Sequence, residues 1–287
     1  MLVTAYLNGQ TAGHSADHER TPGRRDVVKG WTSAAVRRHT KWLYSIDASC
    51  LRGQGYAVTL TVRDCPSSAG EWHALRRRFI KRLERAGLIR FHWVTEWQRR
   101  GVPHMHGALY WDDLGLLDAL ALVLRAWLDV AAAHRPAAGS QDVKRIDGAT
   151  GWLQYLSKHA SRGVKHYQRS GHPEGWEKTG RLWGYGGEWP VVEPMQFDLD
   201  RHAGYRYRRL IRAWTVADAR ATGDPARIAW ARRMLACSDP KLSSVRGVSG
   251  WVPESVSVAL VALLAEQGEG VIQRVENQEG APGSPAA

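Results

Sequence analysis

Two histidines separated by one apolar residue, His104 and His106, are the residues of this chain whose types and spacing best suit chemistry. Successive side chains of a β-strand point to opposite faces, so both imidazoles would project from one face. Glu96 lies eight residues earlier, at the end of an aromatic and β-branched run. A glycine-containing turn near Arg100 would bring Glu96 opposite His104. Two imidazoles and a carboxylate would then converge, which predicts a site for a divalent cation.

The third ligand depends on where this hairpin turns. A slip of one residue would bring Thr95 or Trp97 to the face of the histidines in place of Glu96. His92 shares that face, four residues before Glu96, and is the alternative third ligand. Histidine pairs at this spacing also arise by chance, so the simplest alternative is an exposed strand face with two solvated imidazoles.

A tyrosine further along the chain is a candidate nucleophile. Tyr155 lies in a segment, 147–159, whose apolar residues predict a short helix. Residues three and four apart share a helix face, so the phenol would lie beside Lys158. A nearby ammonium and a metal-polarised phosphate would make a phenol, whose usual pKa is about 10, a usable nucleophile. The alternatives are a core tyrosine at this position and Tyr167 as the nucleophile.

The elements that must position these side chains can be predicted from hydrophobic periodicity. In chain order they are a strand at 56–62, a helix at 70–86, strands at 89–97 and 103–111, a helix at 114–133, a strand at 142–146 and the Tyr155 helix. This order predicts an α+β fold, an antiparallel split-βαβ sheet of the RRM or ferredoxin-like type. We expect helices on one face of this sheet and a ligand on the other.

The flanking sequence suggests a division into four parts. Residues 1–48 form an N-terminal extension, poorly patterned to about residue 30 and followed by a basic helix at 33–44. Residues 49–198 form the central domain, and 199–275 form a basic helical C-terminal region. The Gly/Pro/Ala/Ser tail at 276–287 is expected to be disordered.

Composition favours a nucleic-acid partner in the cytoplasm. The 40 Lys and Arg against 28 Asp and Glu give a net charge of +12, which suits a phosphate backbone. Cys50, Cys65 and Cys237 fit neither a disulfide framework nor zinc-ligand spacing, so we expect reduced, structural thiols in a cytosolic protein. We find no secretory signal and no apolar stretch of membrane-spanning length.

Four segments together resemble a known family. They are a Thr-bearing apolar strand at 56–62, the histidine motif at 103–109, the tyrosine motif at 155–158 and Gly-Arg-Leu-Trp-Gly at 180–184. Their order and spacing, over about residues 50–190, resemble the HUH-superfamily endonucleases. Within that superfamily the chain is similar to the single-tyrosine rolling-circle replication initiators of bacterial plasmids and single-stranded DNA phages.

The resemblance implies that residues 49–198 are an HUH endonuclease domain that nicks and rejoins single-stranded DNA at a replication origin. His104, His106 and Glu96 would hold one Mg²⁺ or Mn²⁺, since this donor set suits harder ions than three histidines do. Tyr155 would form a 5′-phosphotyrosine link, assisted by Lys158. Further basic side chains are expected to contact DNA: Arg99, Arg100, Arg162, Lys165 and Arg181.

The expected partners are single-stranded and origin DNA and a host or plasmid helicase, without a membrane. Two other functions remain open. A related HUH transposase or relaxase would share the chemistry, although relaxases usually place the tyrosine before the histidines. A non-catalytic nucleic-acid-binding module could have the same sheet.

Overall fold

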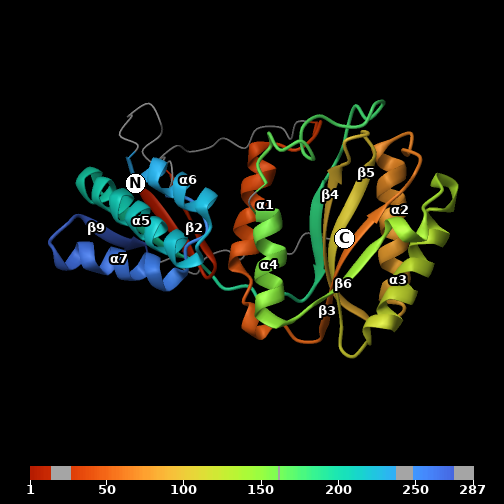
Figure 1. Cartoon of the computed structure of the whole chain (residues 1–287), viewed down its shortest axis with the longest axis horizontal. Coiled ribbons are helices and arrows are strands. Elements are labelled where there is room, and N and C mark those ends of the chain that lie inside the picture. The colour runs from red at the N-terminus through yellow and green to blue at the C-terminus, as the bar shows by residue number, and fades with distance from the viewer. Residues whose placement is uncertain (14–26, 161, 237–247, 275–287) are drawn as a thin grey trace. The chain divides into compact units, whose positions relative to one another are not determined.

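The computed structural model describes residues 1–13, 27–160, 162–236 and 248–274. The chain divides into two compact units (Figure 1). One unit is Arg20–Val191, and the other combines Met1–Glu19 with Val192–Ala287. The sequence-based division had joined residues 1–48 in one extension, whereas the structure separates the first residues from the helix at 33–45.

The unit Arg20–Val191 is built on a five-stranded antiparallel sheet in the order β6-β3-β5-β4-β7. The strands are β3 (Gln54–Thr61), β4 (Leu88–Trp97), β5 (Pro103–Trp111), β6 (Asp142–Ile146) and β7 (Trp183–Gly187). Strands β3 and β4 run parallel with β5 between them, and helix α2 (Ala69–Glu84) connects them. Strands β5 and β6 enclose β3 in the same way, connected by α3 (Leu116–Val130).

Helices α2 and α3 pack on one face of this sheet. Helix α2 begins at Ser68, whose side chain accepts a hydrogen bond from the Glu71 amide, and Glu71 adds an acidic group to the first turn. Its apolar stripe includes Trp72 and Phe79, both 0% exposed. Both rings make edge contacts with Trp127 of α3, at centroid distances of 5.7 and 5.5 Å. These aromatic contacts form the main core.

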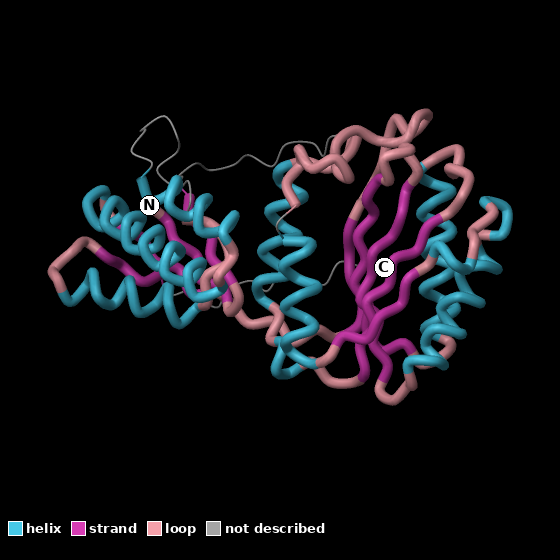
Figure 2. Tube along the Cα trace, in the orientation of Figure 1, coloured by secondary structure: helices cyan, strands magenta, loops and turns pink. Residues whose placement is uncertain are grey.

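Helices α1 (Ser33–Ser45) and α4 (Gly148–Ala160) cover the opposite face (Figures 1 and 2). The prediction of helices on one face only is therefore wrong. The physical reason is that this face is aromatic rather than open. Trp42 of α1 stacks on Tyr185 of β7 at 4.4 Å between ring centroids and contacts His92 of β4 at 4.9 Å. The candidate site thus lies beneath a helical layer.

The second unit contains a four-stranded antiparallel sheet in the order β2-β1-β8-β9. Its strands are β1 (Leu2–Tyr6), β2 (Gly9–Gly13), β8 (Met195–Leu199) and β9 (Val271–Arg274). Helices α5 (Arg201–Thr222), α6 (Pro225–Ala236) and α7 (Glu254–Glu266) complete it. The prediction of a poorly patterned N-terminus and a purely helical C-terminal region is wrong, because Val3 pairs with Phe197 across the chain.

Three further sequence-based expectations concern the surface and the tail. Cys50 and Cys65 are free and exposed, so they are not buried structural thiols, and Cys237 lies outside the described residues. The tail expected to be disordered, 276–287, also lies outside them. Within the described ranges, no helix combines the length and apolar character needed to cross a bilayer.

Candidate active site

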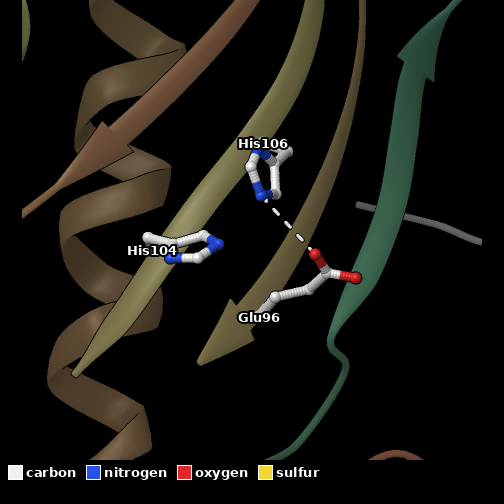
Figure 3. A group of neighbouring side chains, drawn as sticks. All are labelled: Glu96, His104 and His106. Carbon is white, nitrogen blue, oxygen red and sulfur yellow. Dashed lines mark ion pairs between the residues drawn. The ribbon is translucent and has the colours of Figure 1, made fainter. Parts of the chain in front are cut away.

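The three predicted ligands converge on the face of the sheet covered by α1 and α4. Strands β4 and β5 pair in the expected register, with Glu96 opposite His104, and His106 projects from the same face two residues further on. Their exposed fractions are 0, 4 and 5%. One potential ligand atom from each lies within 4.8 Å of the others. Figure 3 shows the Glu96 carboxylate directed toward the His106 ring.

Two arginines from the segment after α4 hold the Glu96 carboxylate. The Arg169 Nε lies 2.8 Å from Oε1, and Arg162 forms an ion pair with Oε2. The Arg169 side chain is completely buried and lies 4.2 Å from the centre of the Trp31 ring. Buried carboxylates persist when they are paired in this way. The two guanidinium groups therefore orient Glu96 and balance its charge.

Neighbouring polar side chains orient both imidazoles. Thr59 lies opposite His106 on β3, and its Oγ1 is 3.0 Å from His106 Nδ1. The other ring nitrogen, Nε2, lies 3.5 Å from a Glu96 carboxylate oxygen. Gln168 places its Nε2 3.3 Å from Nε2 of His104. Such outer contacts fix the ring orientation that a metal ligand needs.

The donor set fits a divalent metal ion. Imidazole and carboxylate ligands in a buried group of three can hold such an ion and leave coordination positions for another ligand. An ion bound there would share Glu96 with Arg162 and Arg169, and like charges weaken its binding. The group Glu96, His104 and His106 is thus a candidate metal centre whose affinity depends on the arginine pair.

Tyr155 lies on α4, over the same face of the sheet. Its phenolic oxygen is 2.8 Å from Nδ1 of His92, and Nε2 of His92 is 2.9 Å from Nε2 of His39 on α1. Tyr155 is only 7% exposed, and burial raises the pKa of its phenol well above the ordinary value. His92, considered as an alternative metal ligand, instead contacts the candidate nucleophile.

The ring of His159 connects Tyr155 to the candidate metal centre. Its centroid lies 4.6 Å from that of Tyr155 and 5.1 Å from that of His106. Among the described residues, neither ring nitrogen of His159 has a hydrogen-bond partner. Lys158 lies on the same helix, but its side chain is outside the described residues. The structure thus brings the tyrosine and the two histidines into one buried aromatic cluster.

Several of these residues were not predicted from the sequence. The shared strand face could indicate that His92 lies near Glu96, but not that it contacts a tyrosine. His39, His159, Arg169 and Gln168 reach the site from helices and a loop distant in sequence, and no local pattern distinguishes them.

The residues expected to contact DNA have different surroundings. Arg100 donates to the Gln98 side chain and to the backbone oxygen of Arg63, which closes the end of the hairpin. Arg162 is occupied by Glu96. Lys165 and Arg181 are exposed. Their contact with DNA stays a prediction.

Beside the β4–β5 turn there is a cleft of about 270 Å³. Its lining includes Arg99 and Tyr167, and the Arg99 guanidinium lies 5.3 Å from the centre of the Tyr167 ring. The Tyr167 side chain is exposed, in contrast to Tyr155. An arginine beside an exposed aromatic ring suits an unpaired nucleotide.

Removal of Glu96 is expected to destabilise the fold, because the Glu96→Ala variant leaves two guanidinium groups in a buried site without a carboxylate. Loss of one side of a buried ion pair typically costs about 3–5 kcal/mol of unfolding free energy. Urea unfolding of the Glu96→Ala variant measures this loss, with exposed Glu188→Ala as the control. A loss below about 1 kcal/mol, typical of surface pairs, would contradict the buried arrangement.

The buried histidines are expected to make stability fall in acid. Burial, with a smaller contribution from Arg169, lowers the pKa of His92 to about 3. The unfolded chain binds a proton at this residue near pH 6.5, so stability is present above about 6.5 and is lost as pH falls toward 3. Within that window His92 contributes a slope of up to about 1.4 kcal/mol per pH unit.

Urea titrations at about pH 7 and pH 5 measure this slope. The His92→Gln variant should show a shallower loss of stability than the unmodified chain. Exposed His172→Gln should leave the slope unchanged. Equal slopes in all three proteins would show that His92 is accessible to protons in the folded state.

The comparisons with known proteins agree on replication. The family described as replication-associated protein ORF2 matches residues 55–167, which include the ligand strands and Tyr155. A protein of Xylella fastidiosa strain 9a5c named as a replication protein is 48% identical over 94% of this chain and 98% of its own length. A replication-associated protein of Pseudomonas phage Pf3 is 45% identical over 93% of this chain and 98% of its own length. No solved structure matches the chain.

These similarities place the chain in a class of proteins associated with DNA replication. More specifically, the chain belongs to the replication-associated protein ORF2 family. The basic composition agrees with DNA as its partner.

Proposed function

We propose that this protein starts rolling-circle replication by nicking single-stranded DNA at an origin and later rejoining it. The observation that carries the proposal is the position of Tyr155, on a helix over the sheet face that presents Glu96, His104 and His106. A nucleophile and a candidate metal centre in one cluster suit phosphodiester transfer.

The topology supports an HUH nuclease sheet. The β3–α2–β4 and β5–α3–β6 connections each pass over one intervening strand, which is the split-βαβ arrangement. The two histidines lie on β5 in the middle of the sheet. We infer that this sheet holds the scissile phosphate against the face that α4 covers.

Glu96, His104 and His106 would hold Mg²⁺ or Mn²⁺. When bound, the cation would stabilise negative charge on the non-bridging oxygens of the scissile phosphate. Thr59 and Gln168 orient the imidazoles, and Arg169 keeps Glu96 ionised and in place. Lys158 stays a proposed contact to the phosphate.

Tyr155 supplies the nucleophilic oxygen. This oxygen forms a bond to phosphorus while the bond from phosphorus to the 3′ oxygen breaks, which leaves a 5′-phosphotyrosine. The phenolic proton passes to Nδ1 of His92, 2.8 Å away, and the released oxygen takes up a proton to become a 3′-OH. The covalent link conserves the phosphodiester bond energy, so the reverse reaction rejoins the strand without ATP.

Burial keeps this centre inactive until DNA is present. The raised pKa of Tyr155 and the lowered pKa of His92 both oppose proton transfer in the closed arrangement. Entry of a DNA backbone would open the helical layer and bring water and charge to the phenol. A helicase would then extend the unpaired region from the nick.

Incubation with a random-sequence single-stranded oligonucleotide library and Mn²⁺ tests this proposal. We expect a covalent protein–DNA adduct under denaturing conditions, and EDTA should prevent its formation. Sequencing of the attached strands would identify the nick site. Reversible binding that EDTA does not affect, without any adduct, would instead support a non-catalytic DNA-binding module.

A further inference from the structure

The second unit contains an arginine-lined cleft that the nicking chemistry does not use. The cleft has a volume of about 350 Å³ and lies along α5 and α6. Four arginines of α5 and one of α6 line it, together with one aromatic residue: Arg208, Arg209, Arg212, Arg220, Arg232 and Tyr205. The α5 residues recur at intervals of three and four, which places them on one helix face.

The charge of this cleft is not balanced by its surroundings. Elsewhere on the same two helices, Arg206 pairs with Glu269 and Arg227 pairs with Asp218. Within the described part of the chain, the cleft lining has no acidic residue, and four of its arginines form no ion pair: Arg208, Arg209, Arg220 and Arg232.

Two of the arginines are partly or fully removed from solvent. Arg212 is 2% exposed, and the buried Nε of Arg208 has no hydrogen-bond acceptor among the described residues. Gathering like charges at low exposure opposes folding unless an anion offsets it. The arrangement therefore predicts an anionic ligand.

Guanidinium groups recognise phosphate oxygens through paired hydrogen bonds. Tyr205 adds a second kind of contact, because its side chain is 51% exposed at the cleft and the Arg208 guanidinium lies 5.0 Å from its ring centre. An exposed ring beside arginines can stack an unpaired base. A duplex accepts a protruding element in its groove, whereas this surface is a narrow hollow.

We propose that this cleft binds single-stranded DNA, with backbone phosphates on the arginines and a base on Tyr205. The choice of DNA as the anion rests on the proposed function, whereas the existence of the anion site rests on the charges alone. The second unit would thus grip an unpaired strand through residues separate from the nicking centre.

Fluorescence anisotropy of the full chain with a labelled single-stranded oligonucleotide tests the arginines. The Arg209→Gln/Arg232→Gln double variant changes two exposed cleft residues. The matched control, Arg201→Gln/Arg233→Gln, removes the same charge from exposed positions of the same helices outside the cleft. We expect about tenfold weaker binding in the cleft variant and a salt slope reduced by about 1.4, for two phosphate contacts. Equal losses in both variants would overturn the site.

Tyr205 tests the single-strand preference. The Tyr205→Ala variant should weaken single-strand binding by about 5- to 150-fold, because stacking of one base contributes about 1–3 kcal/mol. Tyr205→Trp should retain binding, and duplex affinity should be unchanged in both variants. No loss on the single strand, or an equal loss on the duplex, would overturn the stacking role.

Adduct formation at saturating DNA separates this proposal from the proposed function. The cleft variants should still form the adduct if the nuclease assignment is correct. An unmodified chain without adduct, combined with the expected anisotropy results, would refute nicking and retain the cleft. Normal adduct formation with unchanged anisotropy in the cleft variants would refute the cleft alone.

Discussion

The Tyr155→Phe variant is expected to lose covalent attachment to DNA and at least about 10⁴-fold in cleavage rate, as removal of an enzyme nucleophile typically does. The phenylalanine keeps the ring that packs against Trp152 and His159. It removes only the oxygen that contacts His92. Affinity for DNA should therefore stay within about twofold, because backbone contacts supply most of it.

Tyr167→Phe is the matched control. Tyr167 is exposed in the cleft beside the β4–β5 turn, and its variant should retain adduct formation. A denaturing gel with labelled single-stranded DNA measures both variants. Undiminished adduct in Tyr155→Phe together with its loss in Tyr167→Phe would move the nucleophile to the exposed tyrosine.

The His104→Ala and His106→Ala variants should each reduce metal-dependent cleavage by about 10³-fold or more, because each removes one of three ligands from the candidate metal centre. Calorimetry with Mn²⁺ should show a parallel loss of metal binding. Salt-dependent DNA affinity should persist, since these side chains are nearly buried and do not supply the basic surface.

Exposed His172→Ala serves as the control for both histidine variants and should keep cleavage and metal binding. Histidine variants are preferable to a Glu96 variant here, because loss of Glu96 also destabilises the fold through Arg162 and Arg169. An equal loss of DNA binding and cleavage in the histidine variants would contradict a metal role. Cleavage that no longer responds to EDTA would do the same.

The hairpin that carries the ligands could be predicted because its determinants are local. Alternation along β5 sets the face of His104 and His106, and the turn at Gly101 sets the register that brings Glu96 opposite His104. The bounds of β5 and β6 agree with the prediction for the same reason. The sheet order follows from the alternation of helices and strands.

The helical layer over the site depends on contacts between distant segments. Nothing local to His39 indicates that its ring meets His92, 53 residues away. The Arg169 side chain likewise reaches Glu96 from 73 residues later. Such pairs follow from tertiary packing, which periodicity does not describe.

The N-terminal strands illustrate a local signal that was present but overlooked. Asn8-Gly9 lies between two runs that form the hairpin of β1 and β2, and this dipeptide is a strong hairpin signal. Its pairing partner is nonlocal, because Val3 lies opposite Phe197. The hairpin could have been predicted, whereas its place in the second sheet could not.

The central claim is that Tyr155 becomes covalently joined to DNA beside the Glu96, His104 and His106 group. Protease digestion of the adduct, followed by mass spectrometry, identifies the modified residue directly. The account predicts a nucleotide attached through phosphate to the Tyr155 oxygen, formed only with a divalent cation. Attachment at Tyr167 or another residue, or cleavage that leaves a 5′-phosphate with no protein attached, would contradict it.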